Sequence, residues 1–309
     1  MPDQLSILDA IGNTPLVDLR RIVPKGSGRV VVKLESANPT GSMKDRVARA
    51  VVEGAIAKGA LPPGGTIVEY TAGTTGISLA FVARALGYKA HLIYSDAFSE
   101  EKRRTMLAFG AELTEIDSNG RGITKDLVNA MIAKALEVGA RPSHWLADQL
   151  KNEDGTAGYF ALGDEIWRQT AGKVDAFVHA VSTAHSLHGT SRALRRHKRD
   201  ILTIAVEPAE SAVLSGGSPG SHQIEGIGVG FLPPLWNRGE VDDILVVSTA
   251  EAKDMARRLA KEEAIFAGTS TGANVVAALR VAERLGPGAT VATLVPDSGL
   301  RYLSTDIFR

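Results

Sequence analysis

Short apolar runs alternate with longer amphipathic segments along most of the 309-residue chain. Apolar runs rich in Val and Ile and bounded by Gly or Pro are typical of buried strands. Apolar positions three and four apart, preceded by capping residues, are typical of helices. The pattern predicts strands over residues 30–35, 66–70, 90–94, 112–116, 176–181, 202–206 and 290–295. It predicts helices over residues 47–58, 77–86, 99–109, 123–138, 155–169, 186–196, 249–263 and 272–285.

Strands that alternate with helices of this length favour an α/β fold with mostly parallel sheets covered by helices on both faces. The alternation occurs in two successive runs, which predicts two doubly wound α/β domains. We expect an N-terminal domain over residues 12–148 and a C-terminal domain over 149–309, with residues 1–11 packing on the C-terminal domain. Residues 215–230, which are rich in Gly, Ser and Pro, are predicted to form a long loop.

The overall composition excludes several classes of protein. Lys plus Arg and Asp plus Glu both number 35, so no net charge attracts nucleic acid or an anionic membrane. The chain has no cysteine, which excludes disulfides, thiolate nucleophiles and cysteine-ligated metals. We find neither the basic and apolar regions of a signal peptide nor an apolar run long enough to span a membrane. These features are compatible with a cytoplasmic protein.

The segment 38–46, Asn-Pro-Thr-Gly-Ser-Met-Lys-Asp-Arg, joins a predicted strand to a predicted helix. Pro39 and Gly41 indicate a turn, and Ser42 can cap the helix. Lys44 then lies in the first helical turn, where the helix dipole and any burial favour the neutral amine. A neutral amine can attack an aldehyde and form a Schiff base. The alternative for this segment by itself is a solvated lysine at the start of a helix.

Four segments of the chain resemble the cysteine synthase family, the O-acetylserine sulfhydrylases, with cystathionine β-synthase close by. They are residues 11–16 (Ile-Gly-Asn-Thr-Pro-Leu), 38–46, 226–231 (Gly-Ile-Gly-Val-Gly-Phe) and 296–308. The resemblance extends over nearly the whole chain, in order. It implies a fold type II enzyme of the tryptophan-synthase-β type, with a pyridoxal 5'-phosphate cleft between two domains and a mobile first domain. It also implies that Lys44 holds the cofactor and acts as the catalytic base.

The segment 71–76, Thr-Ala-Gly-Thr-Thr-Gly, connects a predicted strand to a helix, and its backbone amides can bind an anion. By resemblance this loop binds the substrate carboxylate, while Thr74 faces the phenolic oxygen of the cofactor. The family's usual Ser and Asn are Ala72 and Thr74 here. The alternative is a simple strand–helix turn. The substrate-binding residues that the resemblance implies are Thr71, Ala72, Gly73, Thr75, Gln149 and Gly226.

The segment 182–186, Ser-Thr-Ala-His-Ser, opens a predicted helix, which suits a phosphate. The family has a glycine-rich loop here, and three of its glycines are replaced by Ser182, Ala184 and His185. Thr183 is retained, and Ser186 replaces a Thr. All five residues are expected to bind the cofactor phosphate, although His185 could instead obstruct it or reach the substrate.

Three further groups of residues carry a chemical expectation. Ser270, in a Gly-Thr-Ser-Thr-Gly segment, is implied to hydrogen-bond the pyridine nitrogen of the cofactor, although it could equally cap a helix. His179, His185 and His188 lie close in sequence, but no carboxylate completes a ligand set, so no metal site is expected. The basic cluster of helix 186–196 is expected to be a solvated face, with Arg192, Arg195, Arg196, Lys198 and Arg199.

Together these features predict a pyridoxal-phosphate enzyme that replaces the β-substituent of an activated serine. The resemblance implies O-acetylserine or O-phosphoserine as substrate, sulfide or another nucleophile, and a homodimer. One alternative is a β-eliminating lyase that releases pyruvate and ammonia. The second is a non-catalytic binding or regulatory homologue, suggested by the bulky side chains at residues 182–186.

Overall fold

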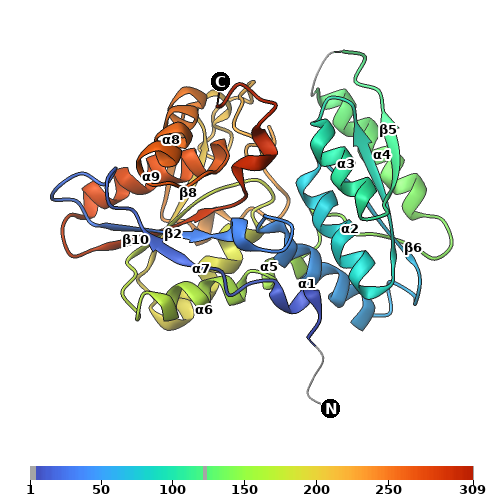
Figure 1. Cartoon of the computed structure of the whole chain (residues 1–309), viewed down its shortest axis with the longest axis horizontal. Coiled ribbons are helices and arrows are strands. Elements are labelled where there is room, and N and C mark those ends of the chain that lie inside the picture. Colours follow the sequence, from blue (N-terminus) through green and yellow to red (C-terminus); the bar gives the residue numbers. More distant parts are fainter. Residues whose placement is uncertain (1–4, 121–123, 309) are drawn as a thin grey trace. The chain divides into compact units, whose positions relative to one another are not determined.

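The computed structural model describes residues 5–120 and 124–308, which form two compact α/β units. Unit 1 contains residues 5–11 and Lys44–Gly158, and unit 2 contains Gly12–Met43 and residues 159–308. Figure 1 shows both units as sheets flanked by helices. None of the helices within the described residues is long and apolar enough to span a membrane.

Unit 1 is built on a four-stranded parallel sheet in the order β5-β4-β3-β6. One core of this unit forms where Val68 and Ile93 of the sheet pack against Met131 and Val138 of helix α4. The strands are β3 (Thr66–Tyr70), β4 (Lys89–Ser95), β5 (Glu112–Ile116) and β6 (His144–Leu146). The helices are η1 (Ile7–Ala10), α1 (Lys44–Ala57), α2 (Thr74–Leu86), α3 (Glu100–Ala108), α4 (Lys125–Gly139) and α5 (Asp154–Ala157).

Unit 2 is built on a six-stranded sheet in the order β1-β2-β10-β7-β8-β9, and only the β1–β2 pair is antiparallel among its described strands. The strands are β1 (Leu16–Asp18), β2 (Arg29–Leu34), β7 (Ala176–Ala180), β8 (Leu202–Pro208), β9 (Asp243–Val247) and β10 (Thr290–Val295). The longer helices are α6 (Phe160–Gln169), α7 (His185–His197), α8 (Thr249–Glu262) and α9 (Thr269–Leu285). The short helices are η2 (Glu35–Ala37), η3 (Ala209–Ser211), η4 (Arg238–Glu240) and η5 (Gly299–Tyr302).

Strand β2 explains why the division into units differs from the expected domain boundaries. It pairs in parallel with β10 along its whole length, so residues 12–43 belong to the sheet of unit 2 (Figure 1). The opening residues 5–11 belong instead to unit 1, where Arg49 donates a 2.9 Å hydrogen bond to the Leu8 carbonyl. The expected boundaries implied two crossings between domains, whereas the chain crosses three times between the units.

Most predicted elements are present, with differences at their ends. Strands 66–70, 112–116 and 290–295 have the predicted bounds. The helix predicted over 155–169 is divided into α5 and α6. The helix predicted over 249–263 is α8, and Ser248 caps it in a reciprocal capping box with Glu251. Residues 215–230 form a loop, as predicted, and residue 123 of the fourth predicted helix lies outside the described residues.

Candidate active site

Lys44 is the first residue of α1, and its side chain is half-buried. The next residue, Asp45, is fully buried and accepts a 2.7 Å hydrogen bond from the Ser78 hydroxyl of α2. This bond fixes the first turn of α1 against a neighbouring helix. Lys44 therefore projects from a rigid helix start, where the dipole disfavours a positive charge.

Residues 71–76 form a tight turn after β3, and Thr71 organises it. Its buried hydroxyl accepts hydrogen bonds from the backbone amides of Gly73, at 2.9 Å, and Gly76, at 3.1 Å. Gly73 adopts a φ of 116°, and a side chain at Gly76 would collide with the methyl group of Thr71. Both glycines are thus required by the turn. The predicted residues Thr74 and Thr75 follow at the N-terminus of α2.

Gln149 is held by three hydrogen bonds within unit 1. Its side-chain oxygen accepts from the Thr75 hydroxyl at 2.9 Å, and its side-chain nitrogen donates to the Tyr70 carbonyl at 3.1 Å. Its backbone amide donates to the Glu69 carboxyl at 3.0 Å. The structure therefore brings together two residues that the sequence analysis assigned to the substrate, Thr75 and Gln149. Glu69, which was not predicted, holds Gln149 through its backbone amide.

Glu69 is fully buried on β3, and its two oxygens accept from the amides of Tyr70 and Gln149. Burial raises the pKa of this carboxyl to about 8, although the two amides oppose the shift. Its neighbours are largely apolar and include Val47, Val51 and Leu79. Glu69 is therefore largely protonated at neutral pH. Nothing in its sequence context, a strand position between apolar residues, indicated this role.

Residues 182–186 lead from β7 into α7, and the backbone keeps a turn that favours glycine. Ala184 adopts a φ of 72°, in the left-handed region, and directly precedes the helix. Ser182 and Ser186 are half-buried, while Thr183 and His185 are buried. The retained backbone shape leaves the first amides of α7 without partners inside the helix, where an anion can bind, and residues 182–186 carry three hydroxyl groups.

The three histidines near this turn have different surroundings. His185 lies with its Nδ1 3.0 Å from the Thr183 hydroxyl. His179, on β7, contacts Ser186 and Asn274, whereas His188 contacts the segment around Glu240. Burial lowers the pKa of His188, although the nearby Glu240 carboxylate opposes the shift. Among the described residues, no group of three or more His, Asp or Glu side chains is arranged to hold a metal ion.

Ser270 lies in the first turn of α9, following Gly268. Its side chain is 5% exposed, and its hydroxyl forms no hydrogen bond with any residue in the described part of the chain. A side chain at Gly268 would collide with the ring of Tyr302, whose hydroxyl donates to Asp297 at 2.7 Å. The closing segment thus packs directly on the start of α9. A buried hydroxyl without a protein partner suits a polar ligand atom.

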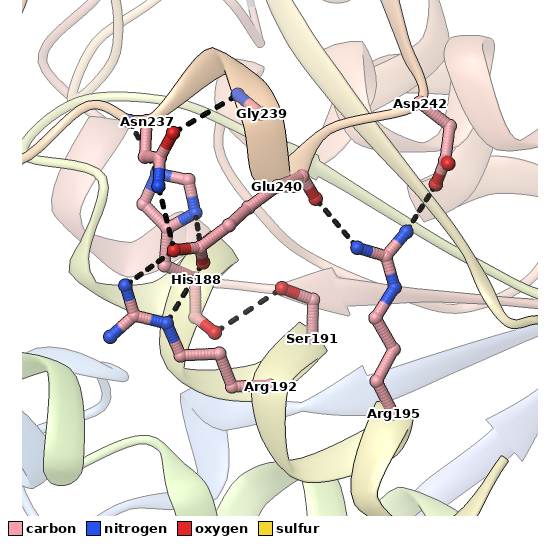
Figure 2. Close-up of polar contacts among 8 residues, drawn as sticks. All are labelled: His188, Ser191, Arg192, Arg195, Asn237, Gly239, Glu240 and Asp242. Atoms are coloured by element: carbon pink, nitrogen blue, oxygen red, sulfur yellow. Dashed lines mark hydrogen bonds and ion pairs between the residues drawn. The ribbon is translucent and has the colours of Figure 1, made fainter. Parts of the chain in front are cut away.

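The loop that follows β8 and the basic cluster of α7 contain the remaining predicted residues. Gly226 has a φ of 84° in the loop that follows β8. The basic cluster is not a simple solvated face, because Arg192 and His188 both contact the carboxylate of Glu240 (Figure 2). Arg195 binds the Glu240 carbonyl and the Asp242 carboxylate. The cluster therefore attaches residues 237–242 to α7.

The chain matches the model of the family described as "Pyridoxal-phosphate dependent enzyme" over residues 7–297. The chain belongs to this family. It is 41% identical over 305 residues to a cysteine synthase of Staphylococcus aureus strain Mu50, covering 98% of this chain and 96% of that protein. The crystal structure of an Entamoeba histolytica cysteine synthase matches with a TM-score of 0.92 and 38% identity, over 100% of this chain and 92% of the other.

A second solved structure extends the comparison. An O-acetylserine-dependent cystathionine β-synthase of Helicobacter pylori matches with a TM-score of 0.91 and 35% identity, over the full length of both chains. The predicted fold class, two α/β units with mostly parallel sheets in a fold type II enzyme, is thereby confirmed. The predicted family and its cofactor, pyridoxal 5'-phosphate, are confirmed as well.

The donor groups in the chain fit pyridoxal phosphate. Its phosphate needs several hydrogen-bond donors, and the turn at 182–186 offers hydroxyls and helix amides. Its ring nitrogen needs one polar partner, which the buried hydroxyl of Ser270 can be. Its aldehyde needs an amine, and Lys44 carries one in the motif that the resemblance identifies. The bulky side chains at 182–186 therefore do not remove the donors that the cofactor requires.

Proposed function

We propose that this protein catalyses the formation of cysteine and acetate from O-acetylserine and sulfide, with pyridoxal phosphate as cofactor. The observation that carries the proposal is the 41% identity to a cysteine synthase over 98% of the chain. An activity assigned from a fold alone would be weak, because one fold hosts many activities. Here the similarity covers the whole chain and includes the lysine motif at residues 38–46.

In this proposal Lys44 has two tasks. Its amine would hold the cofactor through the aldehyde, and the same amine, when free, would remove the proton at Cα of the substrate. When bound, the cofactor supplies an electron-withdrawing ring that lets the acetate group leave from Cβ. The start of α1 suits a base, because the helix dipole favours the neutral amine.

The turn at residues 71–76 is proposed to bind the substrate carboxylate. The Thr71 hydroxyl accepts the two bonds that shape the turn and keeps its own proton to donate. The proposed donors toward the substrate are therefore this hydroxyl, backbone amides at the N-terminus of α2 and the side chain of Gln149. The Gln149 nitrogen has two hydrogens, and one of them is given to Tyr70. The second is proposed to donate to the carboxylate. Ala72, Gly73, Thr74 and Gly226 remain proposed contacts of the substrate and cofactor.

Ser270 is proposed to meet the pyridine nitrogen. A neutral hydroxyl does not compel protonation of that nitrogen, as an aspartate would. The ring then withdraws electrons less strongly, which suits a reaction in which the leaving group departs as the proton is removed. This favours chemistry at Cβ over reactions that need a long-lived carbanion.

The test is to incubate the purified protein with O-acetylserine and sulfide and to measure cysteine and acetate in equal amounts. Replacing Lys44 with Ala should abolish both products and the cofactor absorbance. Replacing the exposed Lys25 with Ala is the matched control and should change neither. Pyruvate and ammonia with no cysteine would overturn the proposal in favour of the lyase. A protein that binds no cofactor would favour the non-catalytic alternative.

The assembly and location follow from the same family membership. We propose a homodimer, as the resemblance implies, and a cytoplasmic location, with which the composition is compatible. The zero net charge and the absence of cysteine are compatible with that location but do not require it. Light scattering of the purified protein tests the dimer directly, because a mass near the 32.6 kDa of one chain would contradict it.

A further inference from the structure

His179 and Ser186, which belongs to the turn that is proposed to hold the phosphate, form a partly buried hydrogen-bonded pair. His179 lies on β7, where it is 3% exposed, and Ser186 is in the first turn of α7. The His179 Nε2 lies 2.9 Å from the Ser186 Oγ. Either the histidine ring or the serine hydroxyl can be the donor in this bond. Which one donates depends on which ring nitrogen carries the proton.

Asn274 of α9 decides that question. Its side-chain oxygen accepts from the Ala180 amide at 2.8 Å, and its nitrogen donates to the Leu294 carbonyl at 3.0 Å. These two bonds fix which end of the amide is the donor. The same nitrogen lies 3.3 Å from the His179 Nδ1. An amide nitrogen can only donate, so Nδ1 accepts and carries no proton.

The neutral ring must then carry its proton on Nε2. His179 therefore donates to the Ser186 oxygen, and Ser186 accepts this bond. Its own hydroxyl proton must go elsewhere, and within residues 5–120 and 124–308 the bond to His179 is the hydrogen bond that this hydroxyl forms. A half-buried hydroxyl that has a proton to donate lies at a helix N-terminus, where anions are favoured.

We propose that His179 is a positioning residue for the cofactor phosphate, which it serves by orienting the Ser186 hydroxyl as a donor. The hydrogen bonds then form a series with one direction, in which Asn274 donates to His179, His179 to Ser186, and Ser186 to the phosphate. Such chains strengthen their members by polarisation. The inference rests on the proposed function, because the phosphate belongs to pyridoxal phosphate.

The pair also explains how the turn tolerates the loss of glycines. Glycine lets backbone amides approach a phosphate closely, and Ser182, Ala184 and His185 reduce that freedom. A side-chain donor with a fixed direction replaces part of that contribution.

The experiment measures how tightly the full-length protein holds pyridoxal phosphate, by equilibrium dialysis and cofactor absorbance. Ser186→Ala and His179→Ala should each weaken binding, by about tenfold for Ser186→Ala, the typical effect of one hydrogen bond to a charged group. The double variant should bind no worse than Ser186→Ala, because His179 acts through Ser186. His179→Gln, which places a donor near the Nε2 position, and Ser186→Thr should restore much of the affinity.

The phosphorus NMR signal of the bound cofactor is the second readout. It should shift in Ser186→Ala and His179→Ala and return toward the wild-type position in His179→Gln. If His179→Ala weakens binding equally in the Ser186→Ala background, His179 has only a structural role and the inference is overturned. It is also overturned if the wild type binds the cofactor and the single variants bind as well as it does.

Failure of the proposed function is distinguishable from failure of this inference. A wild-type protein with no cofactor absorbance and no bound phosphorus signal would overturn both. If His179→Ala does not fold, as judged by circular dichroism, the comparison of Ser186→Ala with Ser186→Thr still decides the matter. Equal cofactor affinity in these two variants would show that the hydroxyl does not donate, and would overturn the proposal.

Discussion

The hydroxyl of Thr75 donates a 2.9 Å hydrogen bond to the side-chain oxygen of Gln149. Thr75 opens α2, and Gln149 lies beyond β6, so the bond joins two separate stretches of unit 1. It also orients the amide, because an oxygen that accepts from Thr75 leaves the nitrogen to donate. Gln149 is therefore set as a donor before any substrate arrives, which lowers the entropic cost of binding.

Replacing Thr75 with Val should raise the KM for O-acetylserine about fivefold and leave kcat nearly unchanged. Valine has the shape of threonine but cannot donate, so Gln149 loses one of its three bonds. Loss of binding that is equal in the ground and transition states changes KM alone. Initial rates at varied substrate concentration provide the measurement.

Thr75→Ser is the matched control, since it retains the hydroxyl and should remain within about twofold of the wild type. Gln149→Ala should raise KM further than Thr75→Val, because it removes the proposed donor itself. A fall in kcat with unchanged KM in Thr75→Val would show that the pair acts on the reaction and not on binding.

Ala184→Gly should stabilise the protein by up to about 1 kcal/mol. Ala184 has a φ of 72°, which disfavours residues with a Cβ, and glycine removes that strain at some cost in chain entropy. Thermal unfolding at a fixed cofactor concentration measures the change. Ala133→Gly, at an exposed position inside α4, is the control and should destabilise by about 0.5–1 kcal/mol. A loss of stability in both variants would show that residue 184 is not strained.

The sequence predicted the elements that local chemistry determines. Strand 290–295 is a run of β-branched and small residues, and the helix predicted over 99–109 is present as α3, which Ser99 caps. It did not predict β1 (Leu16–Asp18), because a three-residue strand exists only through its pairing with β2. Helix α9 begins at Thr269 and not at residue 272, since its glycines were interpreted as a loop. Gly272 instead lets α8 approach, where a Cβ would lie 1.9 Å from the Ala252 carbonyl.

The candidate site was predicted in part, for a comparable reason. Motifs identified Lys44, the turn at 71–76 and the turn at 182–186 by the chemistry of their residue types. They could not reveal Glu69 or Asn274, whose roles depend on packing between segments far apart in the chain. Both residues are buried polar groups with several hydrogen bonds. Such groups are recognised from coordinates and not from spacing.

Replacing Lys33 with Met should destabilise the protein by about 3–5 kcal/mol. The Lys33 amine is fully buried and lies 2.6 Å from the Glu165 carboxylate, so its removal leaves a buried negative charge. Denaturant unfolding measures the change. The double variant Lys33→Met, Glu165→Met is the control and should lose less than the single variant, since no charge then remains. A single variant as stable as the wild type would show that Glu165 takes up a proton or reaches water.

The stability of the protein should fall between about pH 5 and pH 8 because of Glu69. Burial raises its pKa from 4.5 in the unfolded chain to about 8 in the folded protein. In that interval the folded state holds a proton that the unfolded state has lost. The free energy of unfolding therefore decreases as pH rises, by at most about 1.4 kcal/mol for each pH unit. Below the interval both states are protonated, and above it both are ionised.

Glu69→Gln isolates this contribution, because an amide does not titrate. The variant also loses unfolding free energy by an amount that does not depend on pH, because an amide cannot accept from both Tyr70 and Gln149 as the carboxyl does. The informative quantity is thus the difference in unfolding free energy between variant and wild type, measured by denaturant at several pH values. As pH rises from 5 to 8, the wild type should lose stability relative to the variant. The contributions of other titrating groups are the same in both proteins and cancel in the difference. A difference that is independent of pH would place the pKa of Glu69 near its ordinary value, and would mean that the carboxyl holding Gln149 is ionised in the working protein.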